Sequence, residues 1–188
     1  DGIYTDTGER SDRGDQYTQL VNDYLCGQKT EMDIRLGFSS PCSKMVSHEL
    51  VKRHRIRYEE VPVHNDNYFS LLIGYYANKI AAVNETVYIA TVSKGSLTKR
   101  YDYKAIQSGF LVILRCNKFL KEHDLSRYQN SIMFSLFQVR RFGIKKILKF
   151  TKLLIKYRQN PLIGYKRWIE SYILYKKKHK RDKKYITY

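Results

Sequence analysis

The alternation of apolar and polar side chains predicts three helices in the first 100 residues. Apolar side chains recur at helical spacing over residues 15–27, at Leu20, Val21, Tyr24 and Leu25. Ser47 is a suitable N-cap for a helix over residues 47–53. A third, apolar-rich helix is expected to begin with Asn65 or Asp66 as its N-cap.

The stretches between these helices predict irregular or extended backbone. Residues 1–15 are polar, contain three glycines and lack periodicity, so we expect a loop or a frayed terminus. Residues 32–36 are expected to form a brief strand, and residues 42–46 a strand or an extended segment. Residues 78–93 are rich in β-branched side chains and favour a strand with a turn at residues 84–85.

The second half of the chain is predicted to be mainly helical. A long helix is expected over residues 103–123, and Ser126 is a suitable cap for the next one. Helical projection of residues 130–158 separates an apolar face from a basic face about 100° round the axis. The apolar face holds Ile144, Ile147, Leu148, Leu154 and Ile155, and the basic face Arg141, Lys145, Lys149, Lys152 and Lys156. A last basic helix, opened by Pro161, is predicted from residue 162 toward residue 178.

Charge divides the chain at about the same place as the predicted elements do. The 188 residues carry a formal net charge of +17. Residues 101–188 contain 22 Lys and Arg against 5 Asp and Glu, whereas residues 1–100 contain 13 of each kind. We therefore predict a mixed-charge domain over residues 1–100, followed by a basic helical region over residues 101–188 that is built to meet an anionic partner.

Cysteine usage indicates a reducing compartment, and the hydropathy pattern indicates neither secretion nor a membrane span. The three cysteines, Cys26, Cys42 and Cys116, have no CxxC spacing, so neither a disulfide framework nor a structural zinc site is expected. His64 is interpreted as a loop histidine and not as a metal ligand. No charged-then-apolar leader opens the sequence, and the apolar run over residues 109–114 is too short to cross a bilayer. We expect a cytoplasmic protein, at the inner face of the cell membrane if the basic region binds lipid.

Asp66 is the strongest candidate for chemistry. A carboxylate at a loop-to-helix junction is held rigidly, and the positive end of the helix dipole favours an anionic group there. Such a carboxylate can serve as a general base that faces a cleft. The alternative is that Asp66 only caps its helix, which is the commoner role of aspartate at this position.

Four segments resemble, in their order, the second half of a family-2 glycosyltransferase of the GT-A fold. That family has a Pro-Trp-x-Lys-Leu-like strand, a Phe-x-Glu loop, an acidic Glu-Asp pair before an apolar helix, and a Tyr-x-Tyr strand leading to a Gly-Ser turn. The corresponding segments here are residues 41–47 (PCSKMVS), 58–60 (YEE), 65–69 (NDNYF), and 87–98, which runs from Val87-Tyr88 to the Ser93-Lys94-Gly95-Ser96 turn.

The resemblance implies an α/β fold and an inverting transfer of a sugar from a nucleotide-diphosphate donor to a hydroxyl of a glycan or lipid-linked acceptor. In the family the Asp of the acidic pair is the general base, which corresponds to Asp66. Substrate-binding residues are implied at Ser43, Lys44, Asn65, Ser93, Lys94 and Ser96. Two positions depart from the family pattern: Cys42 replaces the usual Trp, which removes an aromatic platform for the acceptor, and Asn65 replaces the usual Glu.

The donor-binding part of such an enzyme is not found in this sequence. The family binds Mg²⁺ or Mn²⁺ through an Asp-x-Asp motif that precedes the region matched here, and Asp-x-Asp does not occur in this chain. We therefore expect a divalent metal only in a complete enzyme, with ligands outside this chain. The chain, which begins at Asp1 without Met, is expected to be a C-terminal portion that is inactive alone.

Two other classes of function remain open for the basic region. A basic amphipathic helix with nearby aromatic side chains suits the surface of an anionic membrane, and we favour this partner. A nucleic-acid-binding module would use the same charges with some of the 17 tyrosines, but no helix-turn-helix, RNA-recognition or zinc pattern is present, so nucleic acid is not expected. A non-catalytic helical interaction module, with the apolar stripe as its seam, is the third alternative.

Overall fold

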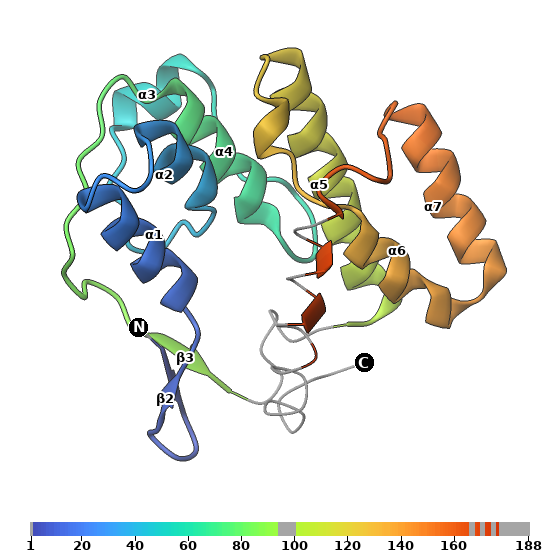
Figure 1. The fold of residues 1–188 in the computed structure, drawn as a ribbon, viewed down its shortest axis with the longest axis horizontal. Helices are drawn as coiled ribbons and strands as arrows, with labels where there is room; N and C mark the ends of the chain where they lie inside the picture. Colours follow the sequence, from blue (N-terminus) through green and yellow to red (C-terminus); the bar gives the residue numbers. More distant parts are fainter. Residues whose placement is uncertain (1, 94–100, 166–167, 170–171, 174–175, 177–188) are drawn as a thin grey trace. The chain divides into compact units, whose positions relative to one another are not determined.

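The computed structural model describes residues 2–93, 101–165, 168–169, 172–173 and 176 (Figure 1). These residues belong to two compact units. The described residues up to 60 and from 65 to 93 form unit 1, and residues 61–64 with those after 100 form unit 2. The chain combines α-helices with one small mixed sheet and is therefore α/β in the broad sense.

A three-stranded sheet joins the first residues of unit 1 to its last ones. Strand β1 (Gly2–Tyr4) pairs antiparallel with β2 (Arg10–Ser11) and parallel with β3 (Ala90–Val92), in the order β2-β1-β3. The hairpin turn contains Gly8 at φ 72°, a left-handed conformation that glycine adopts without strain. The expectation of a loop over residues 1–15 is wrong, because this segment contains β1 and β2. The sequence did not indicate them, since strands this short show no alternation and β3 is distant in sequence.

The predicted strand over residues 78–93 is wrong for most of its length. Only Ala90–Val92 forms a strand, and residues 77–89 form neither helix nor strand. The β-branched side chains of Val87 and Ile89 are exposed, at 65% and 52%. Residues 77–89 therefore form no strand despite their high strand propensity, because none of the described strands lies beside them to pair with.

Unit 1 also contains four helices, which are α1 (Asp15–Leu25), α2 (Glu31–Gly37), α3 (His48–Arg53) and α4 (Asn65–Tyr76). The predictions of α1 and α3 are confirmed, and Ser47 caps α3 by accepting a hydrogen bond from the Leu50 backbone N–H. Helix α4 is confirmed too, but it begins at Asn65. Asn65 and Asp66 therefore lie in its first turn and do not occupy the predicted N-cap position.

Helix α2 replaces the brief strand predicted over residues 32–36. Its N-terminus is a capping box, in which the Thr30 hydroxyl accepts from the Asp33 N–H at 3.2 Å and the Asp33 carboxylate accepts from the Thr30 N–H at 2.7 Å. These two bonds satisfy two helix-end donors and open the helix. The capping signal in the sequence was therefore more informative than the apolar content of the segment.

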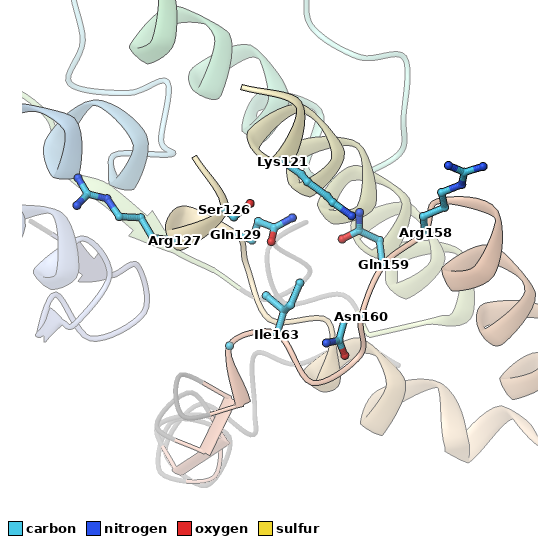
Figure 2. Close-up of a pocket in the computed structure, with 9 residues that line it drawn as sticks. Lys121, Ser126, Arg127, Gln129, Arg158, Gln159, Asn160 and Ile163 are labelled. Atoms are coloured by element: carbon cyan, nitrogen blue, oxygen red, sulfur yellow. The ribbon is translucent and has the colours of Figure 1, made fainter. Parts of the chain in front are cut away.

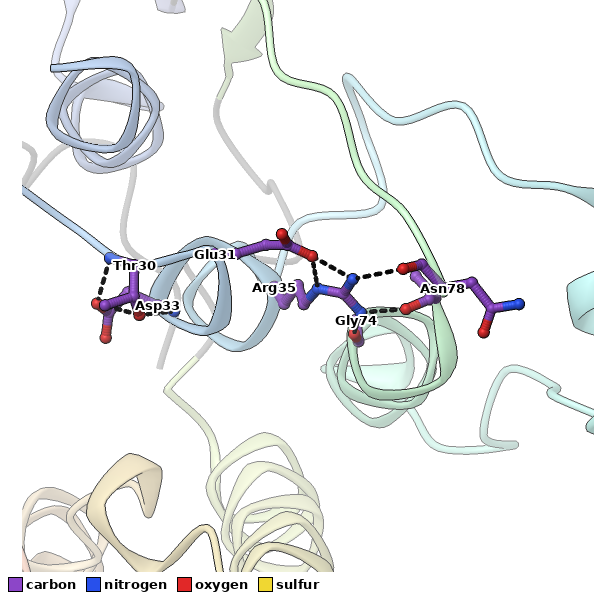
Figure 3. Close-up of polar contacts among 7 residues, drawn as sticks. Thr30, Glu31, Asp33, Arg35, Gly74 and Asn78 are labelled. Atoms are coloured by element: carbon purple, nitrogen blue, oxygen red, sulfur yellow. Dashed lines mark hydrogen bonds and ion pairs between the residues drawn. The ribbon is translucent and has the colours of Figure 1, made fainter. Parts of the chain in front are cut away.

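Arg35 joins α2 to the C-terminal end of α4 (Figure 3). Its guanidinium donates to the carbonyl oxygens of Gly74 at 3.3 Å and Asn78 at 3.2 Å, and also to that of Ala77, while Glu31 binds it from one turn earlier. A cation is favourable there because the last carbonyls of a helix lack intrahelical donors. The helices approach so closely that a Cβ at Gly74 would overlap the Arg35 carbonyl.

Unit 2 is helical and is built around α5 (Tyr103–Glu122), as predicted for residues 103–123. Helices α6 (Met133–Val139) and α7 (Ile144–Lys156) pack against it (Figure 1). The rings of Phe110 on α5 and Phe150 on α7 stack with centroids 4.2 Å apart, and both are fully buried. The rest of this core comes from Ile106, Leu114, Ile132, Val139 and Leu154.

The single helix predicted over residues 130–158 is wrong, because the chain breaks between α6 and α7. Residues Arg140–Phe142 form a 3₁₀ turn, and Gly143 follows with φ 87°. This left-handed residue reverses the chain direction, so that α7 can return to the core. Ser126 likewise begins only a 3₁₀ turn, Ser126–Tyr128, and does not cap a following helix.

The prediction of a last helix from residue 162 toward residue 178 is confirmed in part, because residues 165, 168–169, 172–173 and 176 are helical, while residues 166–167, 170–171, 174–175 and 177–178 lie outside the described residues. Pro161 lies in a turn that continues to Gly164, and residue 165 is the first helical residue after it. Among the residues that the structure describes, no helix is both long enough and apolar enough to span a bilayer.

Candidate active site

The Asp66 carboxylate projects from the first turn of α4 and is half-buried. His64, two residues earlier, adopts φ 64°, so the chain turns sharply immediately before the helix. Within the described part of the chain, no hydrogen bond or ion pair to the Asp66 carboxylate is formed. A carboxylate in this state keeps its lone pairs available for a proton donor from outside the protein.

Lys44 is a predicted site residue that interacts electrostatically with Asp66 in unit 1. Its ammonium group donates a hydrogen bond to the Phe38 carbonyl and lies 5.1 Å from the centroid of the Phe38 ring. Burial lowers the pKa of Lys44 from 10.5 to about 8, and the nearby Asp66 carboxylate opposes this shift. The two side chains therefore form an electrostatically coupled pair within unit 1.

The turn that carries Lys44 replaces the strand or extended segment predicted over residues 42–46. The Cys42 N–H donates to the Ser40 hydroxyl at 3.2 Å, and Ser43 adopts a left-handed φ of 61°. The Phe38 ring, which supports Lys44, packs against Tyr17 of α1 with centroids 4.6 Å apart. A tight turn on an anchored aromatic ring therefore positions the ammonium group.

The loop before α4 is tied to its first turns. The Glu59 N–H donates to the Asn65 carbonyl at 3.2 Å, and the Tyr58 ring stacks on that of Phe69 with centroids 4.1 Å apart. These contacts connect the Tyr58-Glu59-Glu60 segment to the helix that carries Asp66.

Tyr88 lies beside the same turn. A hydrogen bond with Cys42 raises the pKa of the Tyr88 hydroxyl, and the side chain is 48% exposed. The turn at residues 42–44 therefore interacts with two other segments of unit 1, through Cys42 with Tyr88 and through Lys44 with Asp66. Tyr88 was not predicted as a site residue, and neither was Phe38, whose carbonyl acceptor has no signal in the sequence.

The remaining predicted substrate-binding residues have different environments. Ser43 and Asn65 are exposed, and Ser93 is half-buried directly after β3. Lys94 and Ser96 lie outside the described residues. Among the positions that the structure describes, no group of three or more His, Cys, Asp or Glu side chains could hold a metal ion.

A cavity of about 420 Å³ lies in unit 2 (Figure 2). None of the predicted site residues lines it. Its lining includes Lys121, Gln129, Gln159, Arg127 and Arg158. The buried Oε1 of Gln159 has no hydrogen-bond partner among the described residues, so the cavity offers an acceptor for a hydroxyl or amide donor.

The half-buried Asp66 carboxylate of unit 1 is chemically able to accept a proton. Among the described residues, the Asp66 carboxylate accepts no hydrogen bond and interacts electrostatically with the Lys44 ammonium group. Comparisons of the chain with protein-family models, curated proteins and solved structures give no match, so the family resemblance stays a prediction that rests on these residues.

Proposed function

We propose that this chain provides the acceptor-side, base-bearing part of an inverting glycosyltransferase of the GT-A fold. The observation that carries the proposal is the pairing of Asp66, whose carboxylate has no hydrogen bond within the described residues, with the half-buried Lys44. The donor-binding half is assigned to residues outside this chain.

In this mechanism Asp66 accepts the proton of the acceptor hydroxyl. The acceptor oxygen then attacks the anomeric carbon from the face opposite the nucleotide diphosphate, the new C–O bond forms, and the diphosphate leaves with its electron pair. One displacement inverts the anomeric configuration. A rigid base is needed because an alcohol is a poor nucleophile, and positioned general bases contribute rate factors of about 10²–10⁴.

Lys44 and Tyr88 have supporting roles in the proposal. With a pKa of about 8, the Lys44 amine is mostly protonated at neutral pH, so it can donate hydrogen bonds to substrate oxygens while it balances the Asp66 charge. The exposed Tyr88 ring offers an apolar face near Cys42, where the family usually has Trp. No residue of this chain is assigned to a Mg²⁺ or Mn²⁺ ion.

The test is a comparison of Asp66→Asn with Glu49→Gln in the native-length protein that contains this chain. Glu49 is an exposed acid in the first turn of α3, so its variant controls for the loss of a carboxylate at a helix start. Release of nucleotide diphosphate from a panel of nucleotide sugars, with hydroxyl acceptors present, is measured. We expect Asp66→Asn to lower kcat by about 10²–10⁴ and Glu49→Gln to leave it within a factor of two.

Two results would contradict the proposal. The first is equal kcat for wild type and Asp66→Asn when both are folded by circular dichroism. The second is a product that retains the donor's anomeric configuration in NMR, because a single displacement cannot retain it. Sugar transfer by the present chain alone would contradict only one part of the proposal, namely that the donor-binding half lies outside this chain.

A further inference from the structure

Helix α7 has an apolar row that the core of unit 2 does not use. Phe150 and Leu154 point into the core, at 0% and 7% exposure. Ile144, Leu148 and Ile155 are 66%, 54% and 73% exposed. At 3.6 residues per turn these three lie within about 40° of one another, so they form an aliphatic strip along the outside of the helix, with a gap of about two turns between Leu148 and Ile155.

A row of lysines runs beside this strip. Lys145, Lys149, Lys152 and Lys156 are all exposed and lie about 80–140° round the axis from Ile144, on the side away from the core. Lys146 is different, since its ammonium group lies 4.2 Å from the centroid of the Tyr103 ring. The outer surface of α7 therefore has two parallel rows, one aliphatic and one cationic, which we call the α7 face.

No carboxylate neutralises this region locally in the sequence. Between Asp124 and Glu170 the chain contains no acidic residue. Among the described residues none of the four lysines forms an ion pair, so the row presents positive charge next to an aliphatic strip. A partner that fits both rows must present dense negative charge at the boundary of an apolar medium.

We propose that the α7 face binds the surface of an anionic lipid bilayer. Ile144, Leu148 and Ile155 enter the boundary between headgroups and acyl chains, and the four lysines contact lipid phosphates. This combination is typical of helices that lie in the plane of a membrane interface. The sequence predicted a membrane-facing apolar stripe that included Ile147 and Leu154. In the structure Leu154 is buried in the core and Ile147 packs against it, so the exposed stripe is reduced to Ile144, Leu148 and Ile155.

Other occupants fit the face less well. A nucleic acid would contact the lysines but would leave the aliphatic strip in water, since its recognition uses cations, hydrogen bonds and aromatic stacking. A second copy of this chain, docked through the same strip, would bring two lysine rows close together. The proposal does not depend on the proposed transferase function.

The experiment is co-sedimentation of the chain with vesicles of phosphatidylcholine alone or mixed with phosphatidylglycerol, at physiological salt. The apolar variant combines Ile144→Ser, Leu148→Ser and Ile155→Ser. Its matched control combines Val83→Ser, Val87→Ser and Ile89→Ser, three exposed apolar residues of unit 1.

The charge variant replaces Lys145, Lys149, Lys152 and Lys156 with Gln. Its control replaces four other exposed lysines, Lys52, Lys79, Lys104 and Lys118, with Gln, so both variants lose the same charge. We expect each α7 variant to lower partition into the anionic vesicles at least tenfold, and each control to remain within a factor of two of wild type. Wild type is expected to bind the neutral vesicles at least tenfold more weakly than the anionic ones.

Several outcomes would overturn the proposal. One is absence of wild-type binding to the anionic vesicles, and another is an equal loss in an α7 variant and its control. Tighter binding to a random oligonucleotide than to the vesicles, at the same salt, would favour a nucleic-acid partner. A dimer in sedimentation velocity that only the apolar variant dissociates would identify a second copy as the occupant. Circular dichroism of all four variants checks that these exposed substitutions leave the helices folded.

Discussion

The crossing of α2 and α4 in unit 1 and the packing of the helices in unit 2 depend on different interactions. In unit 1, the crossing of α2 and α4 depends on the Arg35 guanidinium and on the missing side chain at Gly74. In unit 2, helices α5, α6 and α7 meet through interlocked apolar side chains centred on Phe110 and Phe150. Directional polar contacts thus fix the α2–α4 crossing in the unit that carries Asp66, whereas apolar contacts join the helices of unit 2, whose α7 lysines are exposed.

The largest effect is expected from Phe110→Ala. Phe110 is fully buried and stacks on Phe150, so the substitution removes a large apolar contact and leaves a cavity, at a cost of about 3–5 kcal/mol in the free energy of unfolding. Hydrogen–deuterium exchange of α5 and α7 peptides, with denaturant titration, measures this loss. Leu148→Ala, at a 54% exposed site on α7, is the control and should cost less than about 1 kcal/mol. Similar losses in both variants would mean that Phe110 does not anchor the core.

Arg35→Met is expected to have the next largest effect. Methionine keeps much of the side-chain volume but leaves the carbonyls of Gly74 and Asn78 without their charged donor, which costs about 1.5–3 kcal/mol. The loss should appear as faster hydrogen exchange in α2 and α4 peptides.

Arg10→Met is the matched control for Arg35→Met. Arg10 also binds a carboxylate, that of Asp15 at 2.7 Å, but its side chain is 66% exposed, so the change should cost less than about 1 kcal/mol. The Arg35 side chain is only 9% exposed. If Arg10→Met destabilises unit 1 as much as Arg35→Met does, the burial of Arg35 does not explain the cost of its replacement.

Sequence patterns predicted the helices well where periodicity was long, and failed where pairing or chain reversal decided the structure. The twenty residues of α5 repeat their apolar spacing over several turns, which left little ambiguity. Strand β1 has only three residues, and its register depends on β3, which no local pattern indicates. Gly143 was visible in the sequence, but its left-handed φ and the resulting break between α6 and α7 depend on the core to which α7 returns.

The candidate site was predictable in its residues but not in its geometry. Asp66 and Lys44 were selected from short motifs, whereas their proximity depends on a turn with left-handed backbone at Ser43, a residue type that rarely adopts it. The Phe38 carbonyl that binds Lys44 is a backbone group, which every residue has. Predicting such contacts requires the tertiary arrangement of α1, the turn and α4.

The smallest and most specific effect concerns the pKa of Lys44. Burial lowers this pKa to about 8, and Asp66 counteracts the lowering, so Asp66→Asn should reduce the pKa further. Titration of the Lys44 side chain by ¹³C NMR, assigned by the signal that Lys44→Arg removes, measures the value. Glu49→Gln serves again as the control and should leave the Lys44 pKa unchanged.

The same shift predicts a dependence of stability on pH. Between about pH 8 and 10.5 the unfolded chain keeps the Lys44 proton that the folded chain has released, so the free energy of unfolding should rise with pH in this window. Lys44→Met should remove that rise, because it removes the titrating group. An unaltered pKa in Asp66→Asn would show that Lys44 and Asp66 are not coupled, and the proposed function would then lose the observation on which it rests.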